Sequence, residues 1–321
     1  MRNRKCDNRK IVRQAHFVLT ASRCIVIVEL LMKRLLPALF ALCVMPAFAD
    51  YFSERTAAME LFNAGKFQEA ADGFLKLGES KNDIQQADAL TNAAICLQRM
   101  QRADEAMALA GKIRSEPMAM ACRIGLLRNG RQWAELLKLA EAQDFTVWPE
   151  KLISPAFLAR GQAHAALRQS DAAEADFLRA QASTLSPDLK AQAWVCIAEN
   201  AGDPQKALDA YAKVCQLAPG GGTLQRALYA RVKLLADQKS WDQALAEVAL
   251  LEKAQNKDPY WICTTHLAYG YIYEKQGKPA LESYRNAAAV PKAPDELVKA
   301  ANAKIAALEG AAPGGTPIEK K

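Results

Sequence analysis

The sequence predicts an all-α fold of about seven antiparallel helix pairs followed by one capping helix, and three observations support this class. Alanine dominates the chain after residue 49, and runs of β-branched residues are scarce. Glycine and proline lie between the apolar segments, where helices end, rather than inside them. A similar segment also recurs every 35 residues on average, which is typical of helical repeats.

Residues 32–49 predict a cleavable export signal. Such a signal has a short basic region, an apolar run of about 7–15 residues and a small-x-small cleavage site. Lys33-Arg34 supplies the basic region, residues 35–46 supply the apolar run, and the sequence AFA precedes Asp50. We therefore expect a protein that is exported from a bacterial cytoplasm and begins at Asp50 after processing.

Two other interpretations of this segment stay open. A membrane anchor would need about 20 apolar residues, and Lys33-Arg34 interrupts the longer apolar run that starts at Ile25. Lipoprotein processing at Cys43 would require a small residue immediately before the cysteine, but Leu42 occupies that position. Cleavage before Asp50 fits the sequence better than either.

Residues 1–31 are basic and irregular, and we interpret them as a non-native upstream extension, with Met32 as the true start. The alternative is an unusually long basic region. Residues 1–49 hold 9 Lys or Arg and 2 Asp or Glu, which accounts for the whole formal charge of +7. The rest of the chain holds 33 basic and 33 acidic residues. This balance argues against the nucleic-acid partner that a pI of about 8.9 would suggest.

The clearest repeat unit is NAGDPQKALDAYAKVCQLAP, from Asn200 to Pro219. It has a turn at Gly202-Asp203, an apolar stripe with the spacing of one helix face, and a closing proline. Six relatives align with it when one residue after each turn is taken as an anchor. The seven anchors are Ala70, Ala106, Leu136, Ala173, Ala207, Ala244 and Ala280.

Two further positions recur with each anchor. Four residues later the chain has Phe74, Ala110, Ala140, Phe177, Tyr211, Val248 and Tyr284. Twelve residues earlier it has small or apolar residues: Ala58, Ala94, Ile124, Gly161, Val195, Val232 and Ala268. A small residue that faces a large one across a short turn lets two antiparallel helices approach closely. The seventh unit has a shortened turn at residues 277–279, which leaves its first-helix register open by about two residues.

This pattern resembles the tetratricopeptide repeat over about residues 51–292. That family has small residues at its close helix contacts, an aromatic residue four positions after its second alanine, and a closing proline. The resemblance implies a right-handed α-solenoid of stacked helix pairs in residues 50–310. It also implies that ligands bind along the concave face made by the first helix of each pair.

Residues 293–310 predict a terminal helix that covers the last apolar face. Pro294 and Asp295 are typical of a helix start, and Gly310 is typical of a helix end. The remaining segment, residues 311–321, has low complexity and is predicted to be disordered.

Cysteine and histidine side chains could form disulfides or bind a metal ion. Five cysteines follow residue 49, an odd number, and export favours disulfides. Cys196 and Cys215 are the one pair that we consider for a bond, because they lie on the two helices of one repeat, but buried free thiols are the favoured interpretation of all five. Cys263 and His266 lie one helical turn apart, yet a zinc site needs three or four ligands. His164 is interpreted as a packing residue, and we predict no metal site.

The sequence has no nucleophile elbow, phosphate-binding loop or clustered pair of acids. Residues 220–222 are all glycine and precede a predicted helix, so their amides could face an anion. A plain repeat junction is favoured because the preceding strand and the lysine of a phosphate-binding loop are missing. We therefore predict no catalytic residue, no cofactor and no enzymatic activity.

The candidate partner-binding residues come from the concave face that the resemblance implies and from the aromatic last repeat. They combine aromatic side chains with cations, which suits the anchoring of a peptide. They are Arg55, Met59, Phe62, Arg99, Tyr229, Lys233, Trp261 and Tyr271. The family's carboxylate clamp needs lysine and asparagine where Arg55 and Met59 stand, so capture of a free C-terminus is not predicted.

Together these features predict a non-enzymatic, periplasmic scaffold of the bacterial cell envelope that binds a protein or peptide partner. The alternative is a repeat domain that positions or regulates an envelope enzyme, acting on peptidoglycan or in outer-membrane assembly. A metal or thiol sensor built on Cys263 and His266 is a weaker hypothesis.

Overall fold

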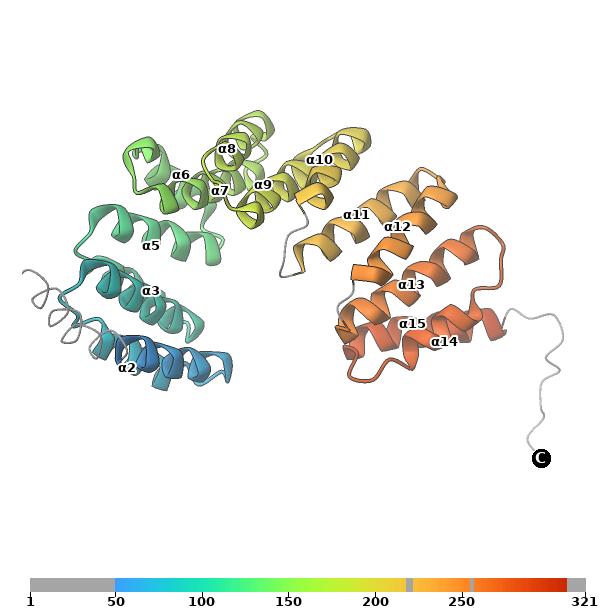
Figure 1. Cartoon of the computed structure of the whole chain (residues 1–321), viewed down its shortest axis with the longest axis horizontal. Coiled ribbons are helices and arrows are strands. Elements are labelled where there is room, and N and C mark those ends of the chain that lie inside the picture. The colour runs from blue at the N-terminus through green and yellow to red at the C-terminus, as the bar shows by residue number, and fades with distance from the viewer. Residues whose placement is uncertain (1–49, 218–221, 255–256, 311–321) are drawn as a thin grey trace, which may run out of the picture. The chain divides into compact units, whose positions relative to one another are not determined.

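The computed structural model describes residues 50–217, 222–254 and 257–310, and every regular element within these ranges is a helix (Figure 1). The predicted export signal, most of the glycine-rich stretch and the predicted tail lie outside the described residues. The all-α prediction is confirmed for the described part of the chain.

Helices alternate with short turns along the chain. Residues 50–63 form the first described helix, and the others follow in this order: α2 (Phe67–Leu77), α3 (Asp83–Arg99), α4 (Ala103–Ala110), α5 (Glu116–Asn129), α6 (Trp133–Glu141), the 3-10 helix η1 (Phe145–Val147), α7 (Glu150–Ala166), α8 (Ser170–Ala182), α9 (Pro187–Asn200), α10 (Pro204–Leu217), α11 (Thr223–Asp237), α12 (Trp241–Ala254), α13 (Pro259–Lys275), α14 (Leu281–Ala288) and α15 (Asp295–Gly310). Within the described residues the α-helices make seven successive pairs and the additional helix α15, as the sequence predicts. The first helices of the pairs are residues 50–63, α3, α5, α7, α9, α11 and α13.

Contacts divide the chain into two compact units. The first ends at Ala119 and the second begins at Met120. In the first unit, α2 packs on α3 and α3 packs on α4. In the second unit, consecutive helices from α6 to α15 pack on one another. Successive packing of helix pairs is the arrangement of an α-helical repeat protein.

The turn inside a pair ends the first helix in a common way. One turn residue has a positive φ in six of the seven pairs: Gly65, Gln101, Arg131, Arg168, Lys239 and Gly277. The next residue donates its amide to a carbonyl five positions earlier, as from Arg102 N to Leu97 O (3.0 Å) and from Gln169 N to His164 O (2.9 Å). This left-handed termination satisfies helix carbonyls and reverses the chain. The repeated turn therefore fixes where each first helix stops.

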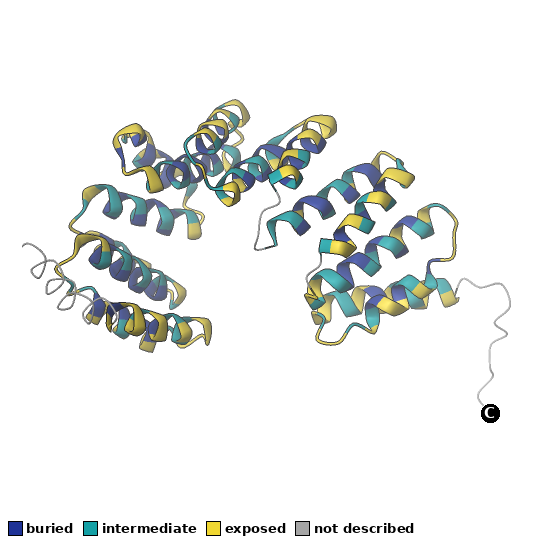
Figure 2. Ribbon diagram, in the orientation of Figure 1, coloured by how far each residue is buried: buried dark blue, intermediate teal, exposed yellow. Residues whose placement is uncertain are grey.

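Close packing within a pair depends on small residues in the first helix. All 21 recurring positions of the seven units are buried. Figure 2 shows buried residues recurring along the helices. A Cβ atom added at Gly161 of α7 would lie 2.5 Å from Cε1 of Phe177 on α8. One added at Gly270 of α13 would lie 2.7 Å from Cε1 of Tyr284 on α14. In these two pairs an aromatic ring lies directly against the backbone of the first helix.

The seventh pair corrects the register expected from its anchor. The expected partner of Tyr284 was Ala268, but Gly270 is the residue that faces the ring. Gly270 precedes the left-handed turn residue Gly277 by seven positions, which is also the spacing between Gly161 and its turn residue. The first helix of the seventh pair thus keeps the same register relative to its turn residue. The segment between that turn residue and the anchor is two residues shorter than in the α7–α8 pair. Ala268 belongs to a core cluster of residues from α10, α11, α12 and α13.

The predicted capping helix is present as α15, which packs on both α13 and α14. Its Ala301 is fully buried in a cluster with Cys263 and Ala287. The thiol of Cys263 donates to the carbonyl of Ala287 at 3.3 Å. α15 therefore covers the apolar face that the last pair would otherwise expose.

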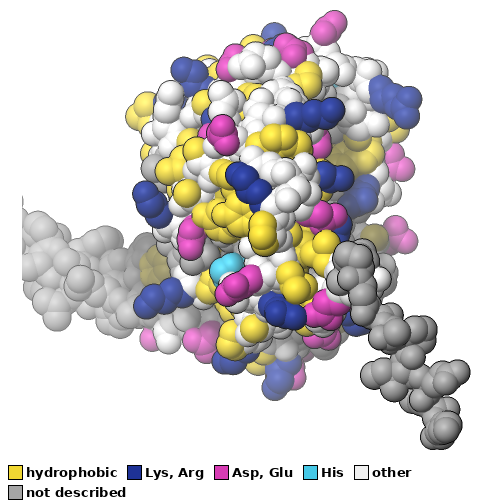
Figure 3. Space-filling view, turned by 90° about the vertical axis from the view of Figure 1, so that its right-hand side faces the viewer, with side chains coloured by type: hydrophobic (Ala, Val, Ile, Leu, Met, Phe, Trp, Pro, Cys, Tyr) yellow, Lys and Arg dark blue, Asp and Glu magenta, His cyan; other side chains and the backbone are white. Residues whose placement is uncertain are grey.

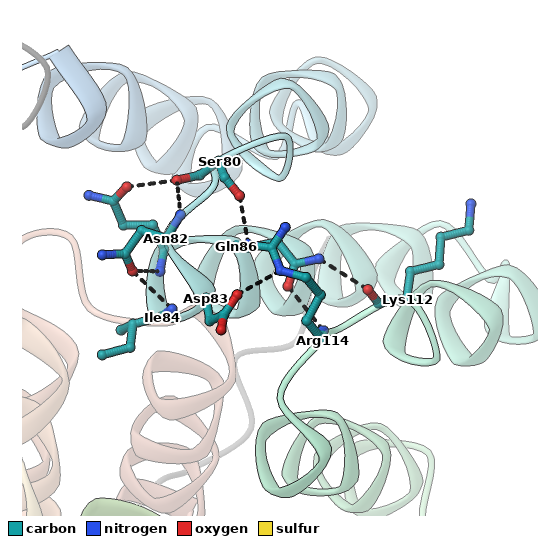
Figure 4. A network of polar contacts seen from close by, with 8 residues as sticks. Ser80, Asn82, Asp83, Ile84, Gln86, Lys112 and Arg114 are labelled. Atoms are coloured by element: carbon teal, nitrogen blue, oxygen red, sulfur yellow. Dashed lines mark hydrogen bonds and ion pairs between the residues drawn. The ribbon is translucent and has the colours of Figure 1, made fainter.

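In the first unit, the buried amide of Gln86 fastens the segment after α4 to α3 (Figure 4). Its Nε2 donates to the carbonyl of Lys112 (3.0 Å), and its Oε1 accepts from the backbone N–H of Arg114 (3.1 Å). The Arg114 guanidinium reaches back to Oδ1 of Asp83 (2.6 Å) and to the carbonyl of Ser80 (2.8 Å). These bonds satisfy the backbone where α4 has ended and hold it against the start of α3.

We expect Gly161→Ala to lower the free energy of unfolding by about 1–3 kcal/mol, because the new methyl group must displace the ring of Phe177 or move the helices apart. Urea unfolding followed by circular dichroism measures the change. Gly202→Ala is the matched control, since a Cβ atom there meets nothing within 4 Å. Equal stability of the two variants would show that the α7–α8 contact is less close than described.

Candidate functional site

Three neighbouring cavities lie along the first helices of the second unit. The first, of about 510 Å³, lies between α5, α7 and α9, with residues of α8 and of the α5–α6 turn, and includes Arg128, Arg131, Trp133, Gln162 and Asn200. The second, of about 520 Å³, lies between α9, α10 and α11 and includes Tyr211, Arg226 and Leu234. The third, of about 420 Å³, is lined by α11, α13, α14 and α15, and we name it the α11–α13 pocket.

The three cavities adjoin one another. Glu199 of α9 lines both the first and the second cavity. Tyr229, Lys233 and Asp237 of α11 line both the second cavity and the α11–α13 pocket. We call the three cavities together the first-helix groove. The second unit therefore carries a row of adjoining cavities along the first helices of its repeats.

Three of the eight predicted partner-binding residues meet in the α11–α13 pocket. Tyr229 and Lys233 come from α11, and Tyr271 comes from α13. Lys233 and Tyr271 both precede the left-handed turn residue of their pair by six positions, so they occupy equivalent places in consecutive repeats. Trp261 does not line the groove cavities and instead packs edge to face on Tyr260, with ring centroids 4.9 Å apart.

The pocket combines an apolar interior with a polar wall. Its interior includes Val232, Ala236, Leu267 and Ala300, together with the rings of the three tyrosines Tyr229, Tyr271 and Tyr284. Burial raises the pKa of the Tyr229 phenol above its ordinary value, so this hydroxyl stays neutral at physiological pH. Tyr271 is exposed, and the ammonium group of Lys275 lies 5.7 Å from the centre of its ring.

A hydrogen-bonded triad from three helices supports the wall beside α15. The Tyr284 hydroxyl of α14 donates to Oε2 of Glu274 on α13 at 2.7 Å. The ammonium group of Lys304 on α15 donates to both oxygens of Glu274, at 3.1 and 3.0 Å. Burial, and then the neighbouring Glu274 carboxylate, raise the pKa of Tyr284. The triad holds α15 in place, so the capping helix forms one side of the pocket.

The other predicted residues lie in the first unit. Arg55 forms a two-point ion pair with Asp88 of α3, with Nε–Oδ2 at 2.6 Å and Nη2–Oδ1 at 3.1 Å. Met59 and Phe62 are half-buried, and Phe62 packs on Phe67 with ring centroids 5.3 Å apart. Arg99 is exposed at the last turn of α3. In the structure Arg55 thus joins two helices of the first unit.

Tyr51 completes the Arg55 network. Its hydroxyl donates to Oδ2 of Asp88 (3.1 Å) and to the carbonyl of Gln85 (3.0 Å). Burial, and then the negative charge of Asp88, raise the pKa of Tyr51 to about 12. Burial tends to raise the pKa of Asp88, but hydrogen bonds from Arg55 outweigh this effect and lower it. These polar side chains fasten the first described helix to α3.

Sequence reasoning missed two arginine–carboxylate pairs that stand at the same repeat position, in which Asp176 is buried and the other three side chains are half-buried. Arg160 of α7 donates to Asp176 of α8 through Nε (2.7 Å) and Nη2 (2.8 Å). Arg231 of α11 donates through Nη2 to Glu247 of α12 at 2.6 Å. In both pairs the carboxylate residue comes 16 positions after the arginine. This shared spacing is the only signal by which the sequence could have indicated the pairs. Each pair ties a first helix to its second helix.

His164 is a packing residue, as predicted. It is buried, its Nδ1 lies 2.6 Å from Oε1 of Gln169, and its Nε2 lies 3.7 Å from Oδ2 of Asp176. All five cysteines of the described chain, including Cys196 and Cys215, are free thiols. No group of three or more histidine, cysteine or acidic side chains among the described residues could hold a metal ion.

Comparison with known proteins gives structural similarity only. No protein-family model matches the chain, and no curated protein matches it. A tetratricopeptide repeat protein from Parabacteroides merdae is 15% identical with a TM-score of 0.47, over 78% of this chain and 98% of that one. PilW, a type IV pilus biogenesis factor, is 18% identical with a TM-score of 0.49, over 63% of this chain and 92% of that one. PilF of Pseudomonas aeruginosa is 18% identical with a TM-score of 0.44, over 64% and 91%.

The repeats themselves decide the kind of fold. A mean period of 35 residues coincides with a helix, a short turn and a second helix, and in two pairs a first-helix glycine faces an aromatic ring of the second helix. The fold is of the tetratricopeptide type. In this tetratricopeptide-type chain the first helices of the second unit line the groove.

Removing the buried carboxylate in Asp176→Ala should lower the free energy of unfolding by about 3–5 kcal/mol, because Arg160 would keep a buried charge without its partner. Asp171→Ala is the matched control on the exposed side of α8 and should cost well under about 1 kcal/mol. Chemical denaturation of both variants provides the measurement. A cost for Asp176→Ala no greater than that of the control would contradict the buried pair.

Proposed function

We propose that this protein is a non-catalytic interaction module that holds a segment of a partner protein in the first-helix groove. The observation that carries the proposal is the α11–α13 pocket, where Tyr229, Lys233 and Tyr271 meet around an apolar interior. Tyrosine and cationic side chains at the centre of a concave surface are typical energetic anchors of protein interfaces. A row of three adjoining cavities suits an extended segment better than a compact ligand.

The groove is built on rigid supports. The Arg160–Asp176 and Arg231–Glu247 pairs fix α7 and α11 against their second helices. The Glu274 triad does the same for α13 and α15. Side chains that are already ordered before binding lose less conformational entropy when a partner arrives, so this support favours affinity.

The proposed location is the bacterial cell envelope, in the periplasm. Support comes from residues 32–49, which have the basic region, the apolar run and the cleavage site of an export signal. No helix of the described residues is long and apolar enough to span a membrane. In this location the partner would be another envelope protein. One such partner would be an envelope enzyme that this protein holds in position.

Photo-crosslinking from the groove tests the interaction function. A photoreactive amino acid at Tyr271 should capture a defined polypeptide in living cells. The same group at Leu250, which is exposed on the second helix α12, should not capture it. Equal capture from both positions, or none from Tyr271, would contradict binding in the groove. One stoichiometric enzyme among the captured proteins would favour the positioning role.

Sequencing the N-terminus of the exported protein tests the location. We expect cleavage after residue 49, so that the chain begins at Asp50. Fractionation of the cells should place that processed form in the periplasm. An uncleaved chain that stays with the cytoplasmic fraction would contradict the proposed location without affecting the groove.

A further inference from the structure

The lining of the first-helix groove carries more positive than negative side chains. On the face shown in Figure 3, basic and acidic side chains are interspersed around hydrophobic ones. The groove is lined by five cations and only two carboxylates. The cations are Arg128, Arg131, Arg226, Lys233 and Lys304, and the carboxylates are Glu199 and Asp237.

Internal ion pairs increase this imbalance. Arg226 is already paired with Glu199, and Lys304 is paired with Glu274 behind the pocket wall. Within the described residues, Arg128, Arg131 and Lys233 have no carboxylate at ion-pair distance, and Asp237 has no cation. The groove therefore presents three free positive charges and one free negative charge, distributed along its length.

The cavities that these free charges line also contain aromatic side chains, and the α11–α13 pocket is the most apolar of the three. Phe177 and Trp133 line the first cavity, Tyr211 lines the second, and Tyr271 lines the α11–α13 pocket. Arg128 and Arg131 stand beside the first cavity, and Lys233 stands between the second cavity and the pocket. An extended segment alternates the directions of its side chains. It can therefore place large apolar side chains in the cavities and carboxylates beside the cations.

We infer that the groove recognises an acidic partner segment in which carboxylates alternate with large apolar side chains. This inference rests on the proposed function and names the chemistry of the partner. Electrostatic complementarity selects the partner and speeds the encounter, while the buried apolar side chains supply most of the affinity. A basic segment would bring like charges together at Arg128, Arg131 and Lys233.

The α11–α13 pocket should hold the principal anchor of that segment. Its volume of about 420 Å³ is ample for a large apolar side chain, such as leucine or phenylalanine, and α15 forms one of its sides. Lys233 is an exposed lining residue of this pocket and has no carboxylate at ion-pair distance among the described residues, so a carboxylate on a neighbouring residue of the segment can pair with it. Lys233 is thus the residue whose charge most directly distinguishes an acidic segment from a basic one.

Two fluorescein-labelled octapeptides test the inference by anisotropy. The acidic probe is Glu-Phe-Glu-Leu-Asp-Phe-Glu-Leu, and the basic probe has lysine at every acidic position. Both are amidated, so that only side-chain carboxylates are compared. We expect the acidic probe to bind at least about tenfold more tightly in low salt, and the difference to shrink as salt screens the charges.

Charge changes at one position show where the acidic probe binds. Lys233→Gln should weaken its binding about threefold and Lys233→Glu about tenfold, since an exposed ion pair is first lost and then replaced by repulsion. Lys213→Glu makes the same change at an exposed position on the second helix α10 and should leave affinity unchanged. Circular dichroism of every variant shows whether it is folded. If the variants are folded, a graded loss of affinity from Lys233→Gln to Lys233→Glu reports lost binding.

Several outcomes would overturn the inference. These are equal or tighter binding of the basic probe, equal weakening by Lys213→Glu, or displacement of the acidic probe by phosphatidylglycerol vesicles, which would indicate an anionic membrane surface instead. If crosslinking from Tyr271 still captures a protein whose captured segment is neutral or basic, the interaction function stands and the acidic specificity fails. If nothing is captured and neither probe binds, both fail.

Discussion

The close approach of the two helices in a pair is the constraint on which the rest of the structure depends. Gly161 and Gly270 have no side chain, so the rings of Phe177 and Tyr284 rest on the backbones of the first helices. Such a contact leaves little room for sliding, because a shift would bring a larger residue under the ring. These contacts fix the α7–α8 and α13–α14 pairs, and six of the seven pairs end their first helix with the same kind of turn. The first helices of the second unit follow one another along one surface. The groove is a consequence of that order.

Buried ion pairs add orientation to this packing. A buried arginine and its carboxylate often contribute little net stability, because both charges lose their hydration. Their geometry is nevertheless demanding, since a shifted helix would leave a buried charge without a partner. Arg160–Asp176 and Arg231–Glu247 occupy the same place in two repeats. We interpret them as fixing the rotation of α7 and α11, and hence the direction in which groove residues such as Lys233 project.

Much of the fold could be predicted from the sequence because the repeats are local. Helix periodicity and turn residues act over a few positions, so the recurring apolar positions were recognised and all are buried. The error at Ala268 arose because the seventh repeat is two residues shorter, and the sequence does not show whether the shortening lies before or after the turn residue. The left-handed conformation of Gly277 identifies the turn residue and places the shortening after it. The groove was predicted less completely. Tyr229, Lys233 and Tyr271 were found from repeat position, but a cavity shared by α11, α13 and α15 depends on packing between elements far apart in sequence.

The central claim is that the first helices of the second unit hold the partner. Hydrogen exchange measured by mass spectrometry tests this claim most directly. The free protein is compared with the protein saturated with a peptide that has been selected for binding from a random display library. A bound segment would order the side chains and helix ends that line the groove. The account predicts slower exchange in α9, α11 and α13, with little change in α8, α10 and α12. Slower exchange confined to those second helices would contradict it.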